Sequence, residues 1–550
     1  MTTLDWLILG LFGAALVGII IWVVRKKSDT TEDYFLAGRD ATWLAIGASI
    51  FASNIGSEHL VGLAGAGASS GMAMAHWEIQ GYLILLLGWL FVPFYARSGV
   101  FTMPEFLERR YNSQSRSFLS IISLVSYVLT KVAVTVYAGG IVFKQVFGIE
   151  SIMGIDFFWI SAIGLVVLTG LYTVFGGMKA VLYTSILQTP VLLIGSIAVV
   201  VIGLIKLGGW SEMMDIARAT PVNEFGDSMT SLIRSSKDPD FPWTGVLFGS
   251  AIIGFWYWCT DQYIVQRVLS GRDQKQARRG TIFGAYLKLT PVFIFLIPGM
   301  LAYALAQKGL IHLPESDAAF PTLVKELLPM GFKGIVVGGL LAALMSSLAS
   351  LFNSSATLFT VDFYKKYKPF ATEKHLVKVG RIATAVVVVL GVLWIPVMKG
   401  LGKVLYVYLQ DVQSLLAPGI AAVFLLGILS KRTTPAAGIT GLTVGFFLGM
   451  TRLALKIFES GVNPDGLIYK VFLAPNWLHY EIALFFIVVA VMVVVSYFSK
   501  PMDPNLIKGL YLGSATPEQK AETRASWNNW DVINSAIIIT IVIAFYAYFW

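Results

Sequence analysis

Apolar runs of about twenty residues recur along the whole chain, and each is long enough to cross a hydrocarbon core about 30 Å thick. Because the membrane interior holds no water, backbone amides and carbonyls there must pair within a helix or a closed barrel. The runs are continuous and do not alternate in polarity, which favours helices. The sequence therefore predicts an all-α integral membrane protein.

The composition agrees with lipid as the solvent. Hydrophobic residues make up 56% of the 550 residues and charged residues 13%, about half the usual share in soluble proteins. The mean hydropathy is +0.73. The longest polar stretches, 207–242 and 499–529, are each too short for an independent core. One cysteine, Cys259, excludes an internal disulfide, and this favours a bacterial inner membrane.

We expect about fourteen transmembrane spans of this length. Their approximate limits are 4–24, 43–65, 72–95, 117–147, 156–175, 181–206, 243–265, 280–306, 333–361, 379–398, 403–428, 435–456, 479–498 and 530–550.

The charges in the loops orient these spans. Basic residues gather in alternate loops, near 25–39, 97–116 and 267–279, whereas the long loop 207–242 is mainly acidic. By the positive-inside rule the basic loops are cytoplasmic and both termini lie outside a cell membrane. These loops also account for the net charge of +9 without a nucleic-acid partner.

Polar residues interrupt several spans, although each ionisable one costs about 2.5–3.5 kcal/mol at a helix centre. In the second span the run Asn54–His59 is strongly polar, and glycines follow it. Such a segment is typical of a discontinuous helix, whose freed carbonyls bind a cation and whose side chains bind a solute. A tight helix crossing with buried hydrogen bonds explains the pattern about equally well.

Two further spans carry unusual residues. The seventh contains three successive aromatic residues, Trp256–Trp258, close to Gly254. They suit either an interfacial aromatic belt or the apolar face of a sugar ring. In the ninth span, Ser346, Ser347 and Ser350 share one helical face. Small residues there permit close helix packing, while their hydroxyls are the oxygen ligands that a sodium ion prefers.

Isolated polar residues complete the set: Glu78, Lys131, Lys288 and Gln410. A lone lysine near a helix end more often extends to the membrane interface. Glu78 and Gln410 reach water less easily. The five histidines have no metal-site spacing, and the sequence offers no nucleophile–base pair, so we do not expect an enzyme.

At these residues the chain resembles the solute:sodium symporter family, in its sodium/glucose (sodium/galactose) cotransporter branch. Several long motifs carry the resemblance, in order, between about residues 33 and 432. They are Asp33–Arg39, Ala52–His59, Leu87–Pro93, Trp256–Gln262, Tyr286–Leu289 and Leu344–Leu348.

The resemblance implies a leucine-transporter-type core of five plus five inverted-repeat helices. Solute and sodium would bind near the membrane midplane and cross by alternating access. The implied segments are 1–42, a first helix and cytoplasmic loop; 43–206, the first repeat; 207–242, an extracellular loop; 243–428, the second repeat; and 429–550, three C-terminal helices.

The resemblance also implies the binding residues. The side chains that would bind the sugar are Asn54, His59, Glu78, Lys288 and Gln410, with Tyr257 closing the inner side of the site and Trp258 beside it. The sodium ligands would be the carbonyls of Ala52, Ile55 and Ala343 and the hydroxyls of Ser346 and Ser347.

The expected function is sodium-coupled import of a glucose- or galactose-type hexose, with no obligatory protein partner. Members with two sodium ions, and some with one, carry an aspartate where this chain has Ser185. Together with Ala349, this departure predicts one sodium per sugar. Gly254 replaces a polar sugar-contacting residue of some relatives, which leaves the exact sugar open. Alternatives are symport of myo-inositol, sialic acid or an amino acid, and a sugar sensor or sodium-leak channel on the same fold.

Overall fold

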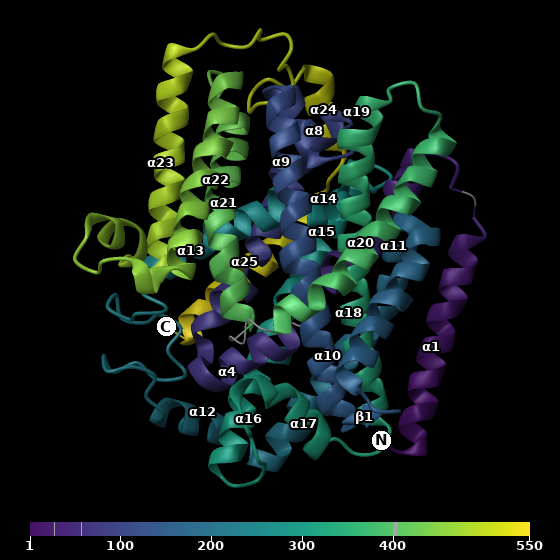
Figure 1. Cartoon of the computed structure of the whole chain (residues 1–550), viewed down its shortest axis with the longest axis vertical. Helices are drawn as coiled ribbons and strands as arrows, with labels where there is room; N and C mark the ends of the chain where they lie inside the picture. Colours follow the sequence, from purple (N-terminus) through teal and green to yellow (C-terminus); the bar gives the residue numbers. More distant parts are fainter. Residues whose placement is uncertain (27, 57, 400–404, 550) are drawn as a thin grey trace.

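The computed structural model describes residues 1–26, 28–56, 58–399 and 405–549 (Figure 1). The chain is helical almost throughout, and its long helices run beside one another along the longest axis of the molecule. Within the described ranges, eleven helices are long and apolar enough to cross a membrane. The predicted all-α membrane architecture is confirmed, while the number of fourteen spans stays a prediction.

The described residues in the first half of the chain form twelve α-helices and one short hairpin. The helices are α1 (Thr3–Val24), α2 (Thr31–Phe35), α3 (Trp43–Asn54), α4 (Ala64–Ser70), α5 (Ala75–Glu78), α6 (Gly81–Leu86), α7 (Val92–Ser98), α8 (Met103–Arg110), α9 (Ser113–Ser126), α10 (Ala133–Phe147), α11 (Phe157–Leu207) and α12 (Trp210–Ala219). The antiparallel strands β1 (Ser151–Ile152) and β2 (Ile155–Asp156) connect α10 to α11.

The second half is also helical. Its helices are α13 (Trp243–Phe255), α14 (Gln262–Leu269), α15 (Gln274–Lys288), α16 (Ile297–Gln307), α17 (Ala319–Leu327), α18 (Phe332–Thr357), α19 (Lys365–Tyr367), α20 (Glu373–Lys399), α21 (Leu405–Leu429), α22 (Pro435–Ile457), α23 (Trp477–Phe498), α24 (Pro517–Ala525) and α25 (Asn529–Phe549).

Short segments of other helix types join these pieces. The π-helical ones are η2 (Glu58–Leu63), η4 (Leu87–Phe91), η5 (Tyr127–Val132), η6 (Trp256–Thr260), η7 (Val292–Leu296), η9 (Leu358–Tyr364) and η11 (Tyr469–Leu473). The 3-10 segments are η1 (Ala37–Arg39), η3 (Gly71–Met74), η8 (Ser316–Ala318) and η10 (Glu459–Gly461). Wider π turns frequently mark functional sites in helices.

Among the described residues, the second and the seventh predicted spans each break into extended backbone beside polar residues. Helix α3 ends at Asn54, and Ile55 is extended with φ −81° and ψ 111°. In the seventh predicted span, η6 gives way to an extended Asp261 with φ −77° and ψ 126°. The predicted discontinuity of the second span is therefore confirmed, and the break at Asp261 is a second one that the sequence did not indicate.

A glycine divides the longest helix, α11. Gly177 has φ 53° and ψ −146°, outside the helical region. A Cβ atom there would lie 2.4 Å from the carbonyl oxygen of Tyr34, so both the backbone and the space demand glycine. The kink falls between the predicted spans 156–175 and 181–206, which occupy its two arms.

Close contacts between helices fix the surroundings of the first break. A Cβ on Gly299 of α16 would lie 1.9 Å from the carbonyl oxygen of Ala64 in α4. Such backbone contact through small residues is how helices associate in lipid. At the end of η6, the buried thiol of Cys259 donates to the Leu83 carbonyl at 3.5 Å. The broken segments are thus held by neighbours on several sides.

The connection between α16 and α18 carries a buried carboxyl. Asp317 in η8 packs against α4, where a Cβ on Gly65 would lie 2.2 Å from its Oδ1 atom. Among the described residues, that oxygen has no hydrogen-bond partner. Burial, with the nearby charge of Glu315, raises the pKa of Asp317 from 3.8 to about 6. The environment therefore stabilises the protonated form relative to an aspartate in water.

This carboxyl predicts a pH dependence of stability. The folded protein holds the proton up to about pH 6, whereas the unfolded chain releases it near 3.8. The contribution of Asp317 to stability is therefore most favourable below about pH 4 and falls as the pH rises towards 6. Asp317→Asn should raise the melting temperature at pH 7.5 by about 1–2 °C, allowing for partial exposure, and change little at pH 4.

Thermal unfolding in detergent at both pH values measures this effect. Asp465→Asn, at an exposed position, is the matched control and should change neither value. An equal shift of the Asp317→Asn variant at both pH values would contradict the assignment.

Candidate functional site

A narrow cavity of about 60 Å³ lies beside the two helix breaks. Polar and aromatic side chains from several spans line it: Asn54, Glu58, His59, Trp77, Glu78, Gln80, Lys131, Val134, Thr135, Ile253, Gly254, Tyr257, Trp258, Tyr263, Lys288, Ser347, Leu351 and Gln413. The volume holds water but no solute of hexose size, so the cavity is too narrow for a hexose in this conformation.

Six of the seven predicted solute-binding residues line this cavity. They are Asn54, His59, Glu78, Tyr257, Trp258 and Lys288. They come from four different spans, and the fold brings them together from positions up to 234 residues apart. The seventh, Gln410, lies outside the residues whose side chains are described, and its role stays a prediction.

The charged members form one buried network. Lys288 Nζ donates to Glu78 Oε2 at 2.6 Å and to Asn54 Oδ1 at 3.1 Å. His59 Nε2 lies 3.4 Å from the same Glu78 oxygen. Asn54 Nδ2 donates to the Tyr257 hydroxyl at 3.1 Å. Lys288 is 3% exposed, which excludes extension to the interface. In this structure these polar groups pair with one another, and an incoming solute must replace some of those hydrogen bonds with its own.

Gln80 is a polar residue of the cavity that the predicted set did not include. Its Oε1 accepts from Trp258 Nε1 at 3.2 Å, and its Nε2 donates to the Ser250 carbonyl at 2.8 Å. A Cβ on Gly254 would lie 2.4 Å from the same Oε1. Gln80 therefore occupies the space that the glycine leaves, which only the fold reveals.

A second buried ion pair lies at the opposite side of the aromatic run. Lys131 Nζ is 2.6 Å from Asp261 Oδ2, and it lies 4.9 Å from the ring centre of Tyr257 and 4.8 Å from that of Tyr263. Asp261 also accepts from the Tyr127 hydroxyl and caps α14. The charged pair and its aromatic surroundings thus connect η5 with the break after η6. In the sequence Asp261 is part of the motif Trp256–Gln262, and nothing there pairs it with Lys131.

The predicted sodium ligands lie where the end of α3 meets the serine face of α18. Ala52, Ile55, Ala343, Ser346 and Ser347 are each at most 1% exposed. Ser53 Oγ is 2.7 Å from Ser350 Oγ, so the two helices are in direct contact. Because α3 ends at Asn54, the carbonyl groups of its last turn have no amide of a following helical turn to accept from. This leaves carbonyl oxygen atoms at the junction without an intrahelical partner.

Hydroxyl groups complete the surroundings of this junction. Ser346 Oγ lies 3.3 Å from Ser185 Oγ, and Ser347 Oγ lies 3.0 Å from the Tyr263 hydroxyl. Each of these hydroxyl groups offers an oxygen atom, which is the kind of ligand that hard cations prefer. In the part of the chain that the structure describes, no group of three His, Cys, Asp or Glu residues is placed to hold a metal ion. The junction suits a monovalent hard ion.

The fold is similar to that of a solved transporter. It matches a substrate-bound, outward-open sodium-coupled sialic acid symporter with a TM-score of 0.76 and 21% identity, over 91% of this chain and 99% of that one. The chain therefore shares the fold of that protein, with the leucine-transporter-type core that the sequence predicted. The model of the family described as Sodium:solute symporter family matches residues 34–445 of this chain. The chain belongs to the Sodium:solute symporter family.

Curated relatives agree with this family. The chain is 38% identical to the sodium/myo-inositol cotransporter 2 of Oryctolagus cuniculus, covering 92% of this chain and 78% of the relative. It is 36% identical to the sodium/glucose cotransporter 1 of Mus musculus, over 95% and 82%. It is 37% identical to the sodium/mannose cotransporter of Bos taurus, over 100% and 97%. This multi-pass membrane protein therefore couples solute transport to sodium, the co-transported ion.

Proposed function

We propose that the protein imports one hexose of glucose or galactose type together with one sodium ion, by alternating access. The observation that carries the proposal is the buried set Asn54, Glu78 and Lys288, whose hydrogen bonds already join a carboxylate, an amide and an ammonium group. Each hydroxyl of a sugar both donates and accepts hydrogen bonds, so it can replace the partners within this set.

The chemistry of the set suits vicinal hydroxyls. Glu78 can accept from two of them, Lys288 can donate, and Asn54 can do both. Leaving one such buried group unpaired costs about 1–3 kcal/mol, which would reject deoxy sugars. Tyr257 and Trp258 offer ring faces to the apolar side of a pyranose, with Tyr257 closing the inner side of the site.

Myo-inositol is the second candidate. It carries hydroxyls around its whole ring, and a relative at 38% identity is named a sodium/myo-inositol cotransporter. Gln80, in the space beside Gly254, adds one more amide that can pair with a hydroxyl. This extra group favours a solute with many hydroxyls over an amino acid, because the ammonium of Lys288, which could bind a carboxylate, is already paired with Glu78.

One sodium per solute is supported by the residues at two positions near the ion junction. Ser185 offers a hydroxyl where some relatives have a carboxylate, and Ala349 offers no oxygen. The basic loops favour the cytoplasmic side, with both termini outside the cell membrane. The two five-helix repeats at 43–206 and 243–428 stay part of this proposal, as does function without an obligatory protein partner.

Counterflow in proteoliposomes tests the proposal. A panel of labelled glucose, galactose, mannose, myo-inositol, sialic acid and an amino acid is offered with and without sodium. We expect sodium-dependent accumulation of a hexose. Accumulation of myo-inositol alone would select the second candidate. Sodium current without uptake would identify a leak channel, and binding without either would identify a sensor.

Ser346→Ala tests the ion junction. Removing one oxygen ligand should raise the half-saturating sodium concentration about tenfold, which corresponds to about 1.4 kcal/mol. Initial uptake rates over a series of sodium concentrations measure it. Ser196→Ala, an equally buried serine on α11, is the control and should leave the sodium dependence unchanged. An unchanged dependence in Ser346→Ala would remove this serine from the ion site.

A further inference from the structure

A second, larger cavity opens on the flank of the molecule between α9, η9 and α20. Its volume is about 770 Å³, and most of its lining is aliphatic. Ile382 is 54% exposed, Val386 51% and Leu390 43%, and all three lie on α20. In a membrane-spanning chain such side chains face lipid. The cavity is therefore a groove open to the hydrocarbon phase.

One end of the groove is polar and basic. Tyr364, His375 and Lys378 line it there, with the Tyr364 hydroxyl 2.7 Å from His375 Nε2. The surrounding segment 365–378 contains five lysines and a single acidic residue, Glu373. Phe370 in the same segment is 97% exposed, as expected for an aromatic residue at the membrane interface. A cationic mouth thus meets an apolar groove.

The length of the apolar part matches one leaflet. From Val379 to Leu390 the helix advances by eleven residues, which is about 16 Å at a rise of about 1.5 Å per residue. Half of a hydrocarbon core about 30 Å thick is about 15 Å. An acyl chain lying along α20 would therefore end near Leu390 while its head group stays at the level of Lys378.

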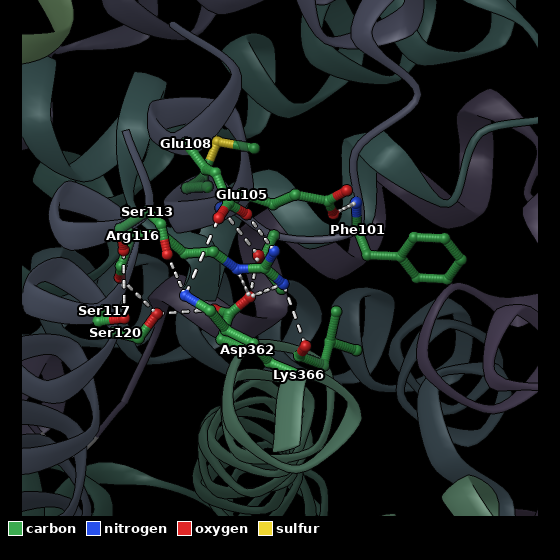
Figure 2. A network of polar contacts seen from close by, with 12 residues as sticks. Phe101, Glu105, Glu108, Ser113, Arg116, Ser117, Ser120, Asp362 and Lys366 are labelled. Atoms are coloured by element: carbon green, nitrogen blue, oxygen red, sulfur yellow. Dashed lines mark hydrogen bonds and ion pairs between the residues drawn. The ribbon is translucent and has the colours of Figure 1, made fainter. Parts of the chain in front are cut away.

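A buried ion pair holds the opposite wall of the groove in place. Figure 2 shows the guanidinium of Arg116 in α9 between Asp362 and Glu108, with Nε 2.9 Å from Asp362 Oδ1. Asp362 also accepts from Ser120 and Thr102, each at 2.8 Å. Asp362 belongs to η9, whose Phe359 and Tyr364 line the groove. The spacing between α9 and η9 is thus set before any ligand enters, which lowers the cost of binding.

We propose that this groove binds one anionic phospholipid, with an acyl chain along α20 and its phosphate at Lys378 and His375. Basic pockets between transmembrane helices next to a lysine-rich segment attract anionic head groups. The apolar groove supplies the area that holds the chain. The inference is independent of which solute the transporter carries.

Native mass spectrometry of the purified protein with added phosphatidylglycerol or phosphatidylcholine tests the site. We expect preferential retention of one phosphatidylglycerol. Lys378→Glu should weaken its binding about fivefold, about 1 kcal/mol, and leave phosphatidylcholine unchanged. Val386→Trp should fill the groove and reduce retention of both lipids. The controls Lys431→Glu and Ile194→Trp, at exposed positions elsewhere, should behave as wild type.

A photoreactive acyl chain keeps the proposal testable if Val386→Trp does not fold. With the wild-type protein, phosphatidylglycerol carrying this group should label residues 379–390 and 124–128 above all other lipid-facing segments. Equal labelling along α23 would overturn the groove as a site. Equal retention of the two lipids, or unchanged retention by Lys378→Glu, would overturn the anionic head group.

Discussion

Glu78→Gln should reduce solute uptake at least about a hundredfold, while the protein still folds and inserts. The glutamate oxygen at the centre of the cavity is the one that both Lys288 and His59 approach, at 2.6 Å and 3.4 Å. Glutamine keeps the shape but replaces a charge-assisted acceptor, which is worth about twice a neutral hydrogen bond. A hundredfold change corresponds to about 2.7 kcal/mol, within the range of about 2–5 kcal/mol for removing one partner of a buried, hydrogen-bonded charge pair.

Initial uptake in proteoliposomes, normalised to inserted protein, measures this loss. Glu481→Gln is a matched control, because Glu481 is equally buried on α23 but does not line the cavity. Its uptake should stay within about twofold of wild type, while Glu78→Ala should be as inactive as Glu78→Gln. Normal uptake by either Glu78 variant would refute the proposed solute site.

Asp261→Asn should destabilise the protein by about 3–5 kcal/mol, because it leaves the ammonium of Lys131 buried without its counter-charge. The amide can still accept the capping bond of α14, so the loss reports on the charge pair. Lys131→Met should cost less, since Asp261 keeps the Tyr127 hydroxyl and the Tyr263 amide as donors.

The double variant separates charge pairing from simple loss of contacts. Lys131→Met with Asp261→Asn should melt at a higher temperature than Asp261→Asn alone, because no unpaired charge remains. Uptake should stay low in Lys131→Met and in the double variant, since Tyr257 loses the ammonium 4.9 Å from its ring centre. Melting curves and uptake together measure this, and strictly additive destabilisation would contradict the ion-pair assignment.

The sequence predicted those features of the site in which polar residues within a single span cost free energy at membrane depth. The break at Asn54–His59 could be foreseen because polar residues are expensive at membrane depth. The convergence of Lys288 on Glu78 followed from the family resemblance, and the contacts agree with it. The pairs Lys131–Asp261 and Arg116–Asp362 could not be foreseen, because their members are 130 and 246 residues apart and meet only through packing.

The role of Gln80 shows a different reason for such a gap. The side chain of Gln80 lies in the space beside Gly254, and the glycine alone does not show which side chain fills that space. The break at Asp261 was hidden likewise, because an aromatic run interrupts hydropathy much less than a polar run does. The sequence therefore shows where a polar residue is costly within one span. Which side chains of different spans fit together depends on how the spans pack.

The buried thiol of Cys259 makes the unmodified chain a convenient background for fluorescence measurements of conformational change. Thiol reagents need an accessible thiolate. This lone cysteine is fully buried, and its thiol donates a hydrogen bond to a backbone carbonyl. Dyes attached at the exposed positions His312→Cys and Lys374→Cys would therefore label selectively, without first removing a native cysteine. Energy transfer from such dyes would follow the opening and closing of the transporter in real time.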